Sequence, residues 1–366
     1  MHAGHTLRHR DPMAPPIVQS SVYVFDDLEE YDAVASGAKP GHIYRRNSNE
    51  NVAMLEAAVA DLEGAPTGVA TGSGMAAILL GVLTLAPRPG PVVVASESYG
   101  VTLAMLRNDL EPLGYETRFV NAGHPDATAA GADGAVLILA ETISNPLCKI
   151  TDLAALVKTA RRAGVPLLVD NTFATPILQR PLDEGATAVV HSATKFIGGH
   201  SDLVAGVLVG GEQAMQQARQ RRSRMGMILG PFDAWLALRG LRTLPLRIGK
   251  QSSNAARLAD KLATLEPVER VHYPGIGAML AFDLCSHDAV QQLIDRLQLA
   301  RFAASLGGVE TTLAVPALTS HRSLSPDELL HLGIGSRTIR VSVGIEDPDD
   351  IVADFEHALH RPERYS

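Results

Sequence analysis

Three short apolar runs of the sequence, 135–140, 165–169 and 188–190, are each followed directly by polar side chains that could do chemistry. These side chains are Glu141, Asn145, Asp170, Ser192, Thr194 and Lys195. Apolar runs of this kind, separated by helical patterns, are typical of buried strands in a mainly parallel sheet. Because ligands bind beyond the carboxyl ends of such strands, the sequence predicts that a carboxylate, hydroxyl groups and a lysine meet at one edge.

Lys195 is the member of this set with the most specific chemical use. Partial burial lowers the pKa of a lysine amine, and the neutral amine can attack an aldehyde to form a Schiff base. Ser192 and Thr194 would place hydroxyl groups beside an anion. Asp170 suits the partner of a protonated pyridine nitrogen, which holds the ring as an electron sink. Together these side chains predict a pyridoxal 5'-phosphate (PLP) site.

A second part of the sequence offers donors for the phosphate group. The stretch 71–76 reads Thr-Gly-Ser-Gly-Met-Ala and leads into an apolar helical segment that runs to Leu85. A glycine-rich turn at the start of a helix presents free backbone N–H groups to an anion. Tyr99 follows the apolar run 92–95 and is placed to stack on the cofactor ring.

Other functions explain parts of the same pattern. The stretch Gly72–Ala77 fits the glycine pattern of a nicotinamide dinucleotide site, NAD or NADP, with Glu97 about 20 to 25 residues further on as the ribose-binding acid. Only Gly68–Ala70 precede these glycines, which makes a poor first strand, and an oxidoreductase leaves Lys195 without a role. A non-enzymatic binding protein with the same fold is the other alternative. The convergence of complementary groups favours the PLP site over both.

The composition limits the class of protein further. The chain has 366 residues, 46% of them hydrophobic, and a formal net charge of −8. This is enough apolar material for one large or two ordinary domains, and the lack of a long basic stripe argues against nucleic-acid binding. The longest apolar run, Met75–Ala86, is shorter than the roughly 20 residues that span a membrane. We therefore expect a small-molecule substrate and neither a nucleic-acid nor a membrane partner.

The cysteines and the N-terminal histidines bear on the compartment and on metals. Cys148 and Cys285 lie far apart and form no CxxC pair, which argues against a structural zinc site and favours a reducing compartment. The sequence thus predicts a cytoplasmic protein. His2, His5 and His9 have helical spacing, but their polar, proline-containing context predicts a solvated arm, so no metal is expected.

The elements that must position these residues fall into three predicted parts. Residues 1–45 are polar and rich in proline and glycine, so they predict an arm without a core of its own. Residues 46–242 predict the large cofactor domain, in which 151–164 carries the capping and stop signals of a crossover helix, and Trp235 is expected in the core. Residues 243–366 predict a smaller α/β domain. Its expected elements are helical segments at 248–265 and 288–298 and strands at 279–284 and 338–343.

Several motifs resemble one known family. Two runs look like the cofactor-lysine region of the Cys/Met-metabolism (trans-sulfuration) PLP-dependent enzymes: Leu-Leu-Val-Asp-Asn-Thr-Phe-Ala-Thr-Pro at 167–176 and His-Ser-Ala-Thr-Lys-Phe-Ile-Gly-Gly-His-Ser-Asp at 191–202. The stretches 15–25, 229–241 and 340–346 are similar to that family's arm, domain junction and C-terminal signature. The resemblance implies an α/β fold of the PLP-dependent transferase (aspartate aminotransferase-like) type, with a mainly parallel central sheet and helices on both faces.

The resemblance also implies a role for each residue around the cofactor. Lys195 would form the Schiff base and move protons at the α and β carbons of the substrate. Asp170 would pair with the pyridinium, and Tyr99 would stack on the ring and help to move a proton. The phosphate would be held by the backbone amides of Gly74 and Met75 and by the hydroxyl groups of Ser192 and Thr194.

Further implied roles concern the substrate and the neighbouring subunit. Arg340 would clamp the substrate carboxylate through a bidentate ion pair, with help from Asn145, and Glu310 would bind a distal amino group. Tyr44 and Arg46 match a Tyr-x-Arg pair that reaches the phosphate of the neighbouring subunit. This implies a homotetramer of two dimers, with active sites shared between subunits.

The implied reaction belongs to sulfur amino acid metabolism. γ-Elimination on cystathionine or a related amino acid would give a 2-oxo acid and ammonia, as in a cystathionine γ-lyase, whereas γ-replacement on an O-acylhomoserine by cysteine would make the chain a cystathionine γ-synthase. Glu310 favours an enzyme that acts on cystathionine. Val101 stands where methionine γ-lyases resemble one another in having a cysteine, which disfavours that alternative without excluding it.

Three stretches depart from the pattern of the family near the substrate. Thr311–Thr312 and 317–322 differ from the commoner sequence, which leaves a specialised substrate open. The segment 273–280 joins a Tyr-Pro-Gly turn almost directly to a strand, where relatives have a longer connection. The choice between lyase and synthase therefore stays open at this point.

Overall fold

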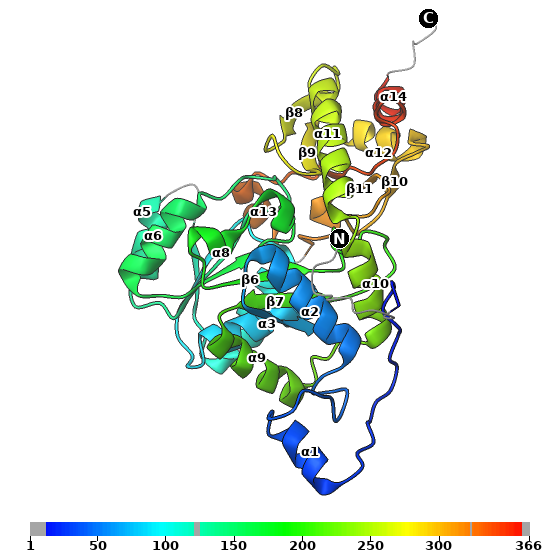
Figure 1. The fold of residues 1–366 in the computed structure, drawn as a ribbon. Coiled ribbons are helices and arrows are strands. Elements are labelled where there is room, and N and C mark those ends of the chain that lie inside the picture. The colour runs from blue at the N-terminus through cyan, green and yellow to red at the C-terminus, as the bar shows by residue number, and fades with distance from the viewer. Residues whose placement is uncertain (1–11, 121–124, 323, 361–366) are drawn as a thin grey trace, which may run out of the picture.

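The computed structural model describes residues 12–120, 125–322 and 324–360, and it contains two sheets with their covering helices (Figure 1). The larger sheet consists of β1 (Thr67–Thr71), β2 (Val92–Ala95), β3 (Thr117–Val120), β4 (Leu137–Glu141), β5 (Leu167–Asp170), β6 (Ala188–Ser192) and β7 (Gly206–Gly210). Its strand order is β1-β7-β6-β5-β4-β2-β3. β7 is antiparallel to both of its neighbours, and the other pairs are parallel. The predicted mainly parallel α/β sheet is confirmed.

Helices cover both faces of this sheet. They are α2 (Glu50–Glu63), α6 (Leu153–Ala163) and α10 (Pro231–Leu241) on one face and α3 (Gly74–Leu85) and α9 (Glu212–Met225) on the other. Side chains of each strand alternate between the two cores, so Val169 of β5 packs with the first group and Leu168 with the second. Burial of each such side chain contributes about 1.5–3 kcal/mol. With both faces covered, the strand ends are left for the site.

Shorter elements connect the strands. They are α4 (Gly100–Ala104), the π-helix η1 (Met105–Leu110), the 3-10 helix η2 (Glu111–Leu113), α5 (Pro125–Ala132), α7 (Thr175–Leu178) and α8 (Pro181–Glu184). The crossover helix α6 has the predicted signals: the Asp152 side chain accepts from the N–H of Ala155 at 2.9 Å, and Gly164 ends the helix with φ of 67°. This left-handed backbone conformation is favourable mainly for glycine, which explains why the helix ends at Gly164.

The second sheet lies at one end of the molecule, opposite the end that carries α1 (Figure 1). Its strands are β8 (Val268–His272), β9 (Met279–Leu284), β10 (Arg301–Phe302), β11 (Thr312–Ala314) and β12 (Thr338–Ser342), in the order β10-β11-β12-β9-β8. The accompanying helices are α11 (Leu244–Leu262), α12 (His287–Arg296), η3 (Pro316–Leu318), α13 (Pro326–Leu332) and α14 (Pro348–Leu359). The predicted boundary after residue 242 falls between α10 and α11, and the division into domains stays a prediction.

One helix lies in the described part of the N-terminal arm, which the sequence predicted only as a polar segment without a core of its own. This helix is α1 (Leu28–Ala35), which has no buried residue. Trp235 is not the core residue that was expected: it is half-buried, and its Nε1 donates to the carbonyl of Pro15 at 2.9 Å, so it fastens the arm to α10. His2, His5 and His9 lie outside the described residues.

Two strands of the larger sheet, β1 and β3, and three of the second sheet, β8, β10 and β11, were not foreseen. β3 has no clear apolar run, and β1 contains the stretch Gly68–Ala70 that was considered a poor strand. That objection was wrong, because β1 pairs with β7 along its full length and buries Val69 and Ala70. Within the part of the chain that the structure covers, no helix has both the length and the apolar character to cross a membrane.

Candidate active site

A cavity of about 360 Å³ opens where β4, β5 and β6 end. Its wall includes Glu141, Asp170 and Ser192, the last residues of these three strands. Nine of the twelve residues predicted to act in catalysis or to bind cofactor or substrate line it: Gly74, Met75, Tyr99, Asn145, Asp170, Ser192, Thr194, Lys195 and Arg340. The strand ends therefore meet as the parallel topology predicts.

The start of α3 forms one end of the cavity. The Ser73 side chain caps this helix by accepting from the N–H of Ala76 at 3.1 Å. The N–H groups of Gly74 and Met75, in the first turn, have no partner within the helix and can bind an anion. A Cβ atom at Gly74 would lie 2.6 Å from the Cβ of Ser192, so only glycine lets the turn approach that hydroxyl group. Backbone donors and a serine hydroxyl thus form a cradle for a phosphate.

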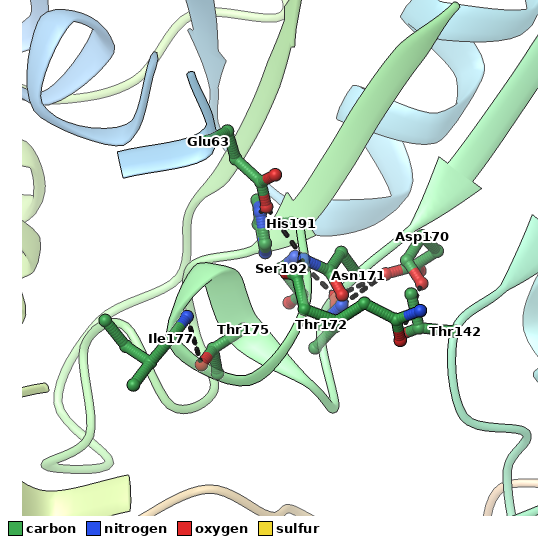
Figure 2. A network of polar contacts seen from close by, with 10 residues as sticks. Glu63, Thr142, Asp170, Asn171, Thr172, Thr175, Ile177, His191 and Ser192 are labelled. Carbon is green, nitrogen blue, oxygen red and sulfur yellow. Dashed lines mark hydrogen bonds and ion pairs between the residues drawn. The ribbon is translucent and has the colours of Figure 1, made fainter. Parts of the chain in front are cut away.

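Thr172 connects Asp170 to the next strand. Figure 2 shows that its backbone N–H and its hydroxyl both donate to Oδ1 of Asp170, at 2.9 and 2.5 Å. The same hydroxyl accepts from the N–H of Ser192 at 2.8 Å. Burial raises the pKa of Asp170, and the bonds from Thr172 and the nearby His191 oppose that rise. A buried carboxylate of this kind is stabilised in its charged form by a cation such as a pyridinium.

A fully buried polar cluster supports the same two strand ends from the other side. Glu63 Oε1 lies 2.6 Å from Nε2 of His191 and accepts from Nδ2 of Asn171 at 2.7 Å (Figure 2). Asn171 follows Asp170, and His191 precedes Ser192. The cluster therefore fixes the backbone that carries the carboxylate of Asp170 and the hydroxyl group of Ser192. No local pattern indicates this cluster, since Glu63 lies 128 residues from His191.

Lys195 points to a residue that the sequence did not reveal. Its Nζ donates to Oγ of Ser305 at 3.0 Å, and the carbonyl of Ser305 accepts from Nη2 of Arg340 at 3.4 Å. Burial, with a smaller contribution from the positive charge of Arg340, lowers the pKa of Lys195 to about 8. A much larger fraction of this amine is neutral at pH 7 than for a lysine in water, which makes it a better nucleophile.

The lowered pKa of Lys195 gives a direct prediction for the cofactor-free chain. Only a neutral amine reacts with acetic anhydride, so the labelling rate of Lys195 should rise with pH and reach half its plateau near pH 8. A lysine in a short unstructured peptide, added to the same reaction, is the internal control and should reach half its plateau above roughly pH 10. Peptide mass spectrometry over a pH series measures both. Coincident profiles for the two lysines would contradict the assignment.

Arg340 of β12 brings the second sheet to the cavity. It is only 3% exposed, and its Nη1 donates to Oδ1 of Asn145 at 3.0 Å. Among the residues that the structure describes, it forms no ion pair. A buried guanidinium group without an acidic partner gains free energy from a bound anion, and its planar fork fits a carboxylate.

Glu141 holds together two parts of the wall. Its carboxylate accepts from the N–H of Tyr99 at 2.7 Å and from the N–H of Asn145 at 3.2 Å. Burial, with the negative charge of Asp170 as the next contribution, raises the pKa of Glu141 to about 8. Burial also raises the pKa of Tyr99, which keeps the phenol protonated at neutral pH. Glu141 thereby fixes the positions of the ring-stacking and carboxylate-binding candidates.

Three residues that the sequence singled out lie outside the cavity wall. Tyr44 is 41% exposed, and the guanidinium group of Arg46 lies 5.5 Å from the centre of its ring. Glu310 is exposed as well. Conversely, Val101, Thr319 and Ser320 do line the cavity, although the sequence marked their stretches only as departures from a pattern.

The residues present fit pyridoxal phosphate at each of its reactive positions. Lys195 offers an amine with a lowered pKa for the aldehyde, and Asp170 offers a buried carboxylate for the pyridine nitrogen. The start of α3 with Ser192 offers donors for the phosphate, and Arg340 remains available for a substrate carboxylate. A dinucleotide site would leave Lys195 and Arg340 unexplained.

Comparisons with known proteins agree with this geometry. Residues 1–360 match the family described as Cys/Met metabolism PLP-dependent enzyme. The chain is 38% identical to the L-methionine gamma-lyase of Pseudomonas putida, over 98% of this chain and 96% of the relative, and 38% identical to the cystathionine gamma-lyase of Bacillus subtilis, over 91% and 92%.

A solved structure is also similar. It is a Campylobacter jejuni protein assigned as an O-acetylhomoserine (thiol)-lyase, with N'-pyridoxyl-lysine-5'-monophosphate at position 205, and it matches with a TM-score of 0.92 and 27% identity over 98% of each chain. The fold, the cavity and these matches agree. The chain belongs to the Cys/Met metabolism family of PLP-dependent enzymes, and pyridoxal 5'-phosphate is its cofactor.

Proposed function

We propose that the chain is a carbon–sulfur lyase that removes the γ-sulfur group of cystathionine or a closely related amino acid. The observation that supports this most is the meeting of Lys195, Asp170 and Arg340 in one cavity. The first two suit the cofactor and the third suits the carboxylate of an amino acid. The curated relatives named above, two γ-lyases, point to the same kind of bond.

Each residue has a defined task in this proposal. Arg340 and Asn145 bind the substrate carboxylate and so direct the α hydrogen toward Lys195. Pyridoxal phosphate, when bound, supplies an electron sink that acidifies this hydrogen. Lys195 Nζ then acts as the base that takes the α proton, gives that proton up again, and in a later step takes a proton from the β carbon. Tyr99 is the proposed second proton carrier.

The overall change then balances in atoms. The γ carbon–sulfur bond of cystathionine breaks and the sulfur takes up a proton, which releases cysteine. Water hydrolyses the remaining four-carbon unit to 2-oxobutyrate and ammonia. Lys195 returns to its starting protonation state, so one water molecule is consumed for each substrate.

A γ-replacement is the second candidate. The same activated four-carbon unit, captured by a thiol instead of water, would make cystathionine from an O-acylhomoserine and cysteine. The similar Campylobacter jejuni protein, assigned as an O-acetylhomoserine (thiol)-lyase, supports γ-replacement as this second candidate. The proposed contact of Glu310 with a distal amino group suits both reactions, since cystathionine carries that group whether it is the substrate of the lyase or the product of the synthase.

We also propose an assembly of two dimers in which Tyr44 and Arg46 complete the phosphate site of the neighbouring subunit. Their exposure on the surface, away from their own cavity, supports this.

We further propose an arm at 1–45, a cofactor domain at 46–242 and a small domain at 243–366. The two cysteines, Cys148 and Cys285, are free thiols, which supports a cytoplasmic location.

The reaction is tested with the purified holoenzyme and three separate assays. We expect cystathionine to yield 2-oxobutyrate and cysteine in equal amounts, with a kcat/KM at least about tenfold above that for methionine, a difference of about 1.4 kcal/mol. The third assay supplies an O-acylhomoserine with cysteine. Net formation of cystathionine that outpaces its cleavage would establish the γ-synthase instead, and preferred release of methanethiol from methionine would establish the methionine γ-lyase.

A further inference from the structure

A buried arginine outside the cavity connects β1 to the turn that carries Tyr44 and Arg46. Arg222 lies in the last turn of α9 and is 3% exposed. Its Nη1 donates to Oε1 of Glu56 at 2.5 Å and to the carbonyl of Ala70 at 3.2 Å, and its Nη2 donates to the carbonyl of Asn47 at 2.6 Å. A buried cation with an ion pair and two carbonyl bonds is a fixed point of the fold.

The carbonyl of Asn47 belongs to the turn that carries Tyr44 and Arg46. The N–H of Asn47 donates to the carbonyl of Tyr44 at 2.8 Å and closes this turn. Two further contacts tie the turn to α9: the Ser223 hydroxyl donates to Oδ1 of Asn47 at 2.7 Å, and Nη1 of Arg46 donates to the carbonyl of Ser223 at 3.1 Å. Arg222 and Ser223 thus hold the turn against the C-terminal end of α9.

The partners of Arg222 depend on it to different degrees. Ala70 is held independently, because it is part of β1 and its N–H also donates to Glu56 at 2.8 Å. On its other side, the described contacts of the turn include the isolated bridge between Val22 and Tyr44, and that bridge leads to the exposed arm. Loss of the guanidinium group should therefore free the turn more than it disturbs the strand.

We propose that Arg222 is a positioning residue for the active site of the neighbouring subunit, because it holds the turn that presents Tyr44 and Arg46 to the partner's cofactor phosphate. This inference rests on the shared site proposed above. It assigns a buried residue of one subunit to the cofactor affinity of the next. Arg222 itself touches neither cofactor nor substrate.

The first experiment measures cofactor affinity in uniform oligomers. The double variant Arg222→Met with Glu56→Gln removes both members of the buried ion pair, so that no uncompensated charge is left in the core. We expect its dissociation constant for pyridoxal phosphate, titrated through the visible absorbance of lysine-linked cofactor, to rise at least about tenfold, as for Arg46→Ala. Ser223→Ala should give a smaller rise in the same direction.

Arg219→Met is the matched control. Arg219 lies one turn earlier on α9 and donates to Oγ1 of Thr67 and to the carbonyl of Gly68, and its described contacts do not include the turn. The control should retain the dissociation constant of the unaltered protein. An equal loss in Arg219→Met and in the double variant would mean that α9 acts only through β1 and would overturn the proposal.

The second experiment separates the two subunits of a site. The double variant is co-expressed with Lys195→Ala subunits, and mixed oligomers are isolated through two affinity tags. Only sites with Lys195 give the visible absorbance. Where such a site faces a Lys195→Ala subunit, it receives an intact turn, so we expect a fraction of lysine-linked sites with unaltered affinity that the uniform double variant lacks. A general loss of stability could not be restored in this way.

The same mixing with Arg46→Ala subunits tells the two proposals apart. If Arg46→Ala regains affinity and the double variant does not, Arg222 acts within its own subunit and the inference is wrong while the shared site stands. If Arg46→Ala does not regain affinity either, the shared site itself is wrong, and this inference falls with it.

Discussion

Replacement of Lys195 by alanine is expected to lower kcat for cystathionine cleavage by at least about ten-thousandfold. The change removes the proposed base for two successive proton transfers, and a positioned base contributes about 10² to 10⁴ for each step it serves. It also removes the nucleophile for the cofactor aldehyde. No other lysine lines the described part of the cavity to replace it.

Two measurements distinguish this loss from damage to the fold. Lys195 is half-buried and contacts Ser305 through its amine, so the alanine variant should keep the thermal midpoint of the parent within a few degrees. It should also lose the visible absorbance of lysine-linked cofactor. Lys158→Ala, on the exposed side of α6, is the control and should change neither property. If the Lys195→Ala protein kept more than about a hundredth of the parent kcat, another residue would be the base.

The site could be predicted from sequence where it depends on strand order alone. Glu141 and Asp170 are directly paired neighbours in the register of β4 and β5, and Ser192 ends β6. In a parallel sheet the carboxyl ends of adjacent strands lie at one edge whatever the helices between them do. Local apolar runs were therefore sufficient to bring these residues together.

Residues whose position depends on a distant partner could not be found in this way. Ser305 contacts Lys195 across 110 residues of sequence, and it lies outside any helix or strand. Arg340 was assigned only through a resemblance. The sequence around a buried strand does not indicate that an arginine on it reaches the cavity at the edge of the larger sheet. Thr172 had a weak signal, a hydroxyl residue two positions after Asp170.

The misjudged elements follow the same logic. β1 contains a glycine and is short, yet its pairing with β7 and its contact with α2 make it a stable strand. Trp235 was expected in the core on hydrophobicity alone, but its indole N–H finds a carbonyl in the arm. In both cases tertiary contacts outweigh the local propensity.

Replacement of Arg340 by methionine is expected to lower kcat/KM about 100- to 1000-fold. The side chain is buried with its Nη1 on Asn145, so a bound carboxylate would meet a desolvated guanidinium group. Loss of one partner from a buried charge pair costs about 2–5 kcal/mol, and the expected factor corresponds to about 3–4 kcal/mol. Arg340→Lys should recover only part of this loss, because a single ammonium group cannot make the forked pair of bonds. Arg337→Ala, with its surface ion pair to Glu269, is the control and should leave kcat/KM within about twofold.

A substrate analogue without its carboxylate makes the assignment of Arg340 specific. The parent enzyme should bind methionine at least about 100-fold more tightly than the corresponding amine, whereas Arg340→Met should bind the two almost equally, since the group that recognises the carboxylate is gone. The positive charge of Arg340 also lowers the pKa of Lys195, so its removal should shift the acetic anhydride profile of Lys195 above pH 8. If Arg340→Met still bound methionine more tightly than the amine by the same factor as the parent, the carboxylate would bind elsewhere in the cavity. Arg340 would then be a structural cation that holds Asn145, and the shift in the Lys195 profile would remain as its electrostatic effect.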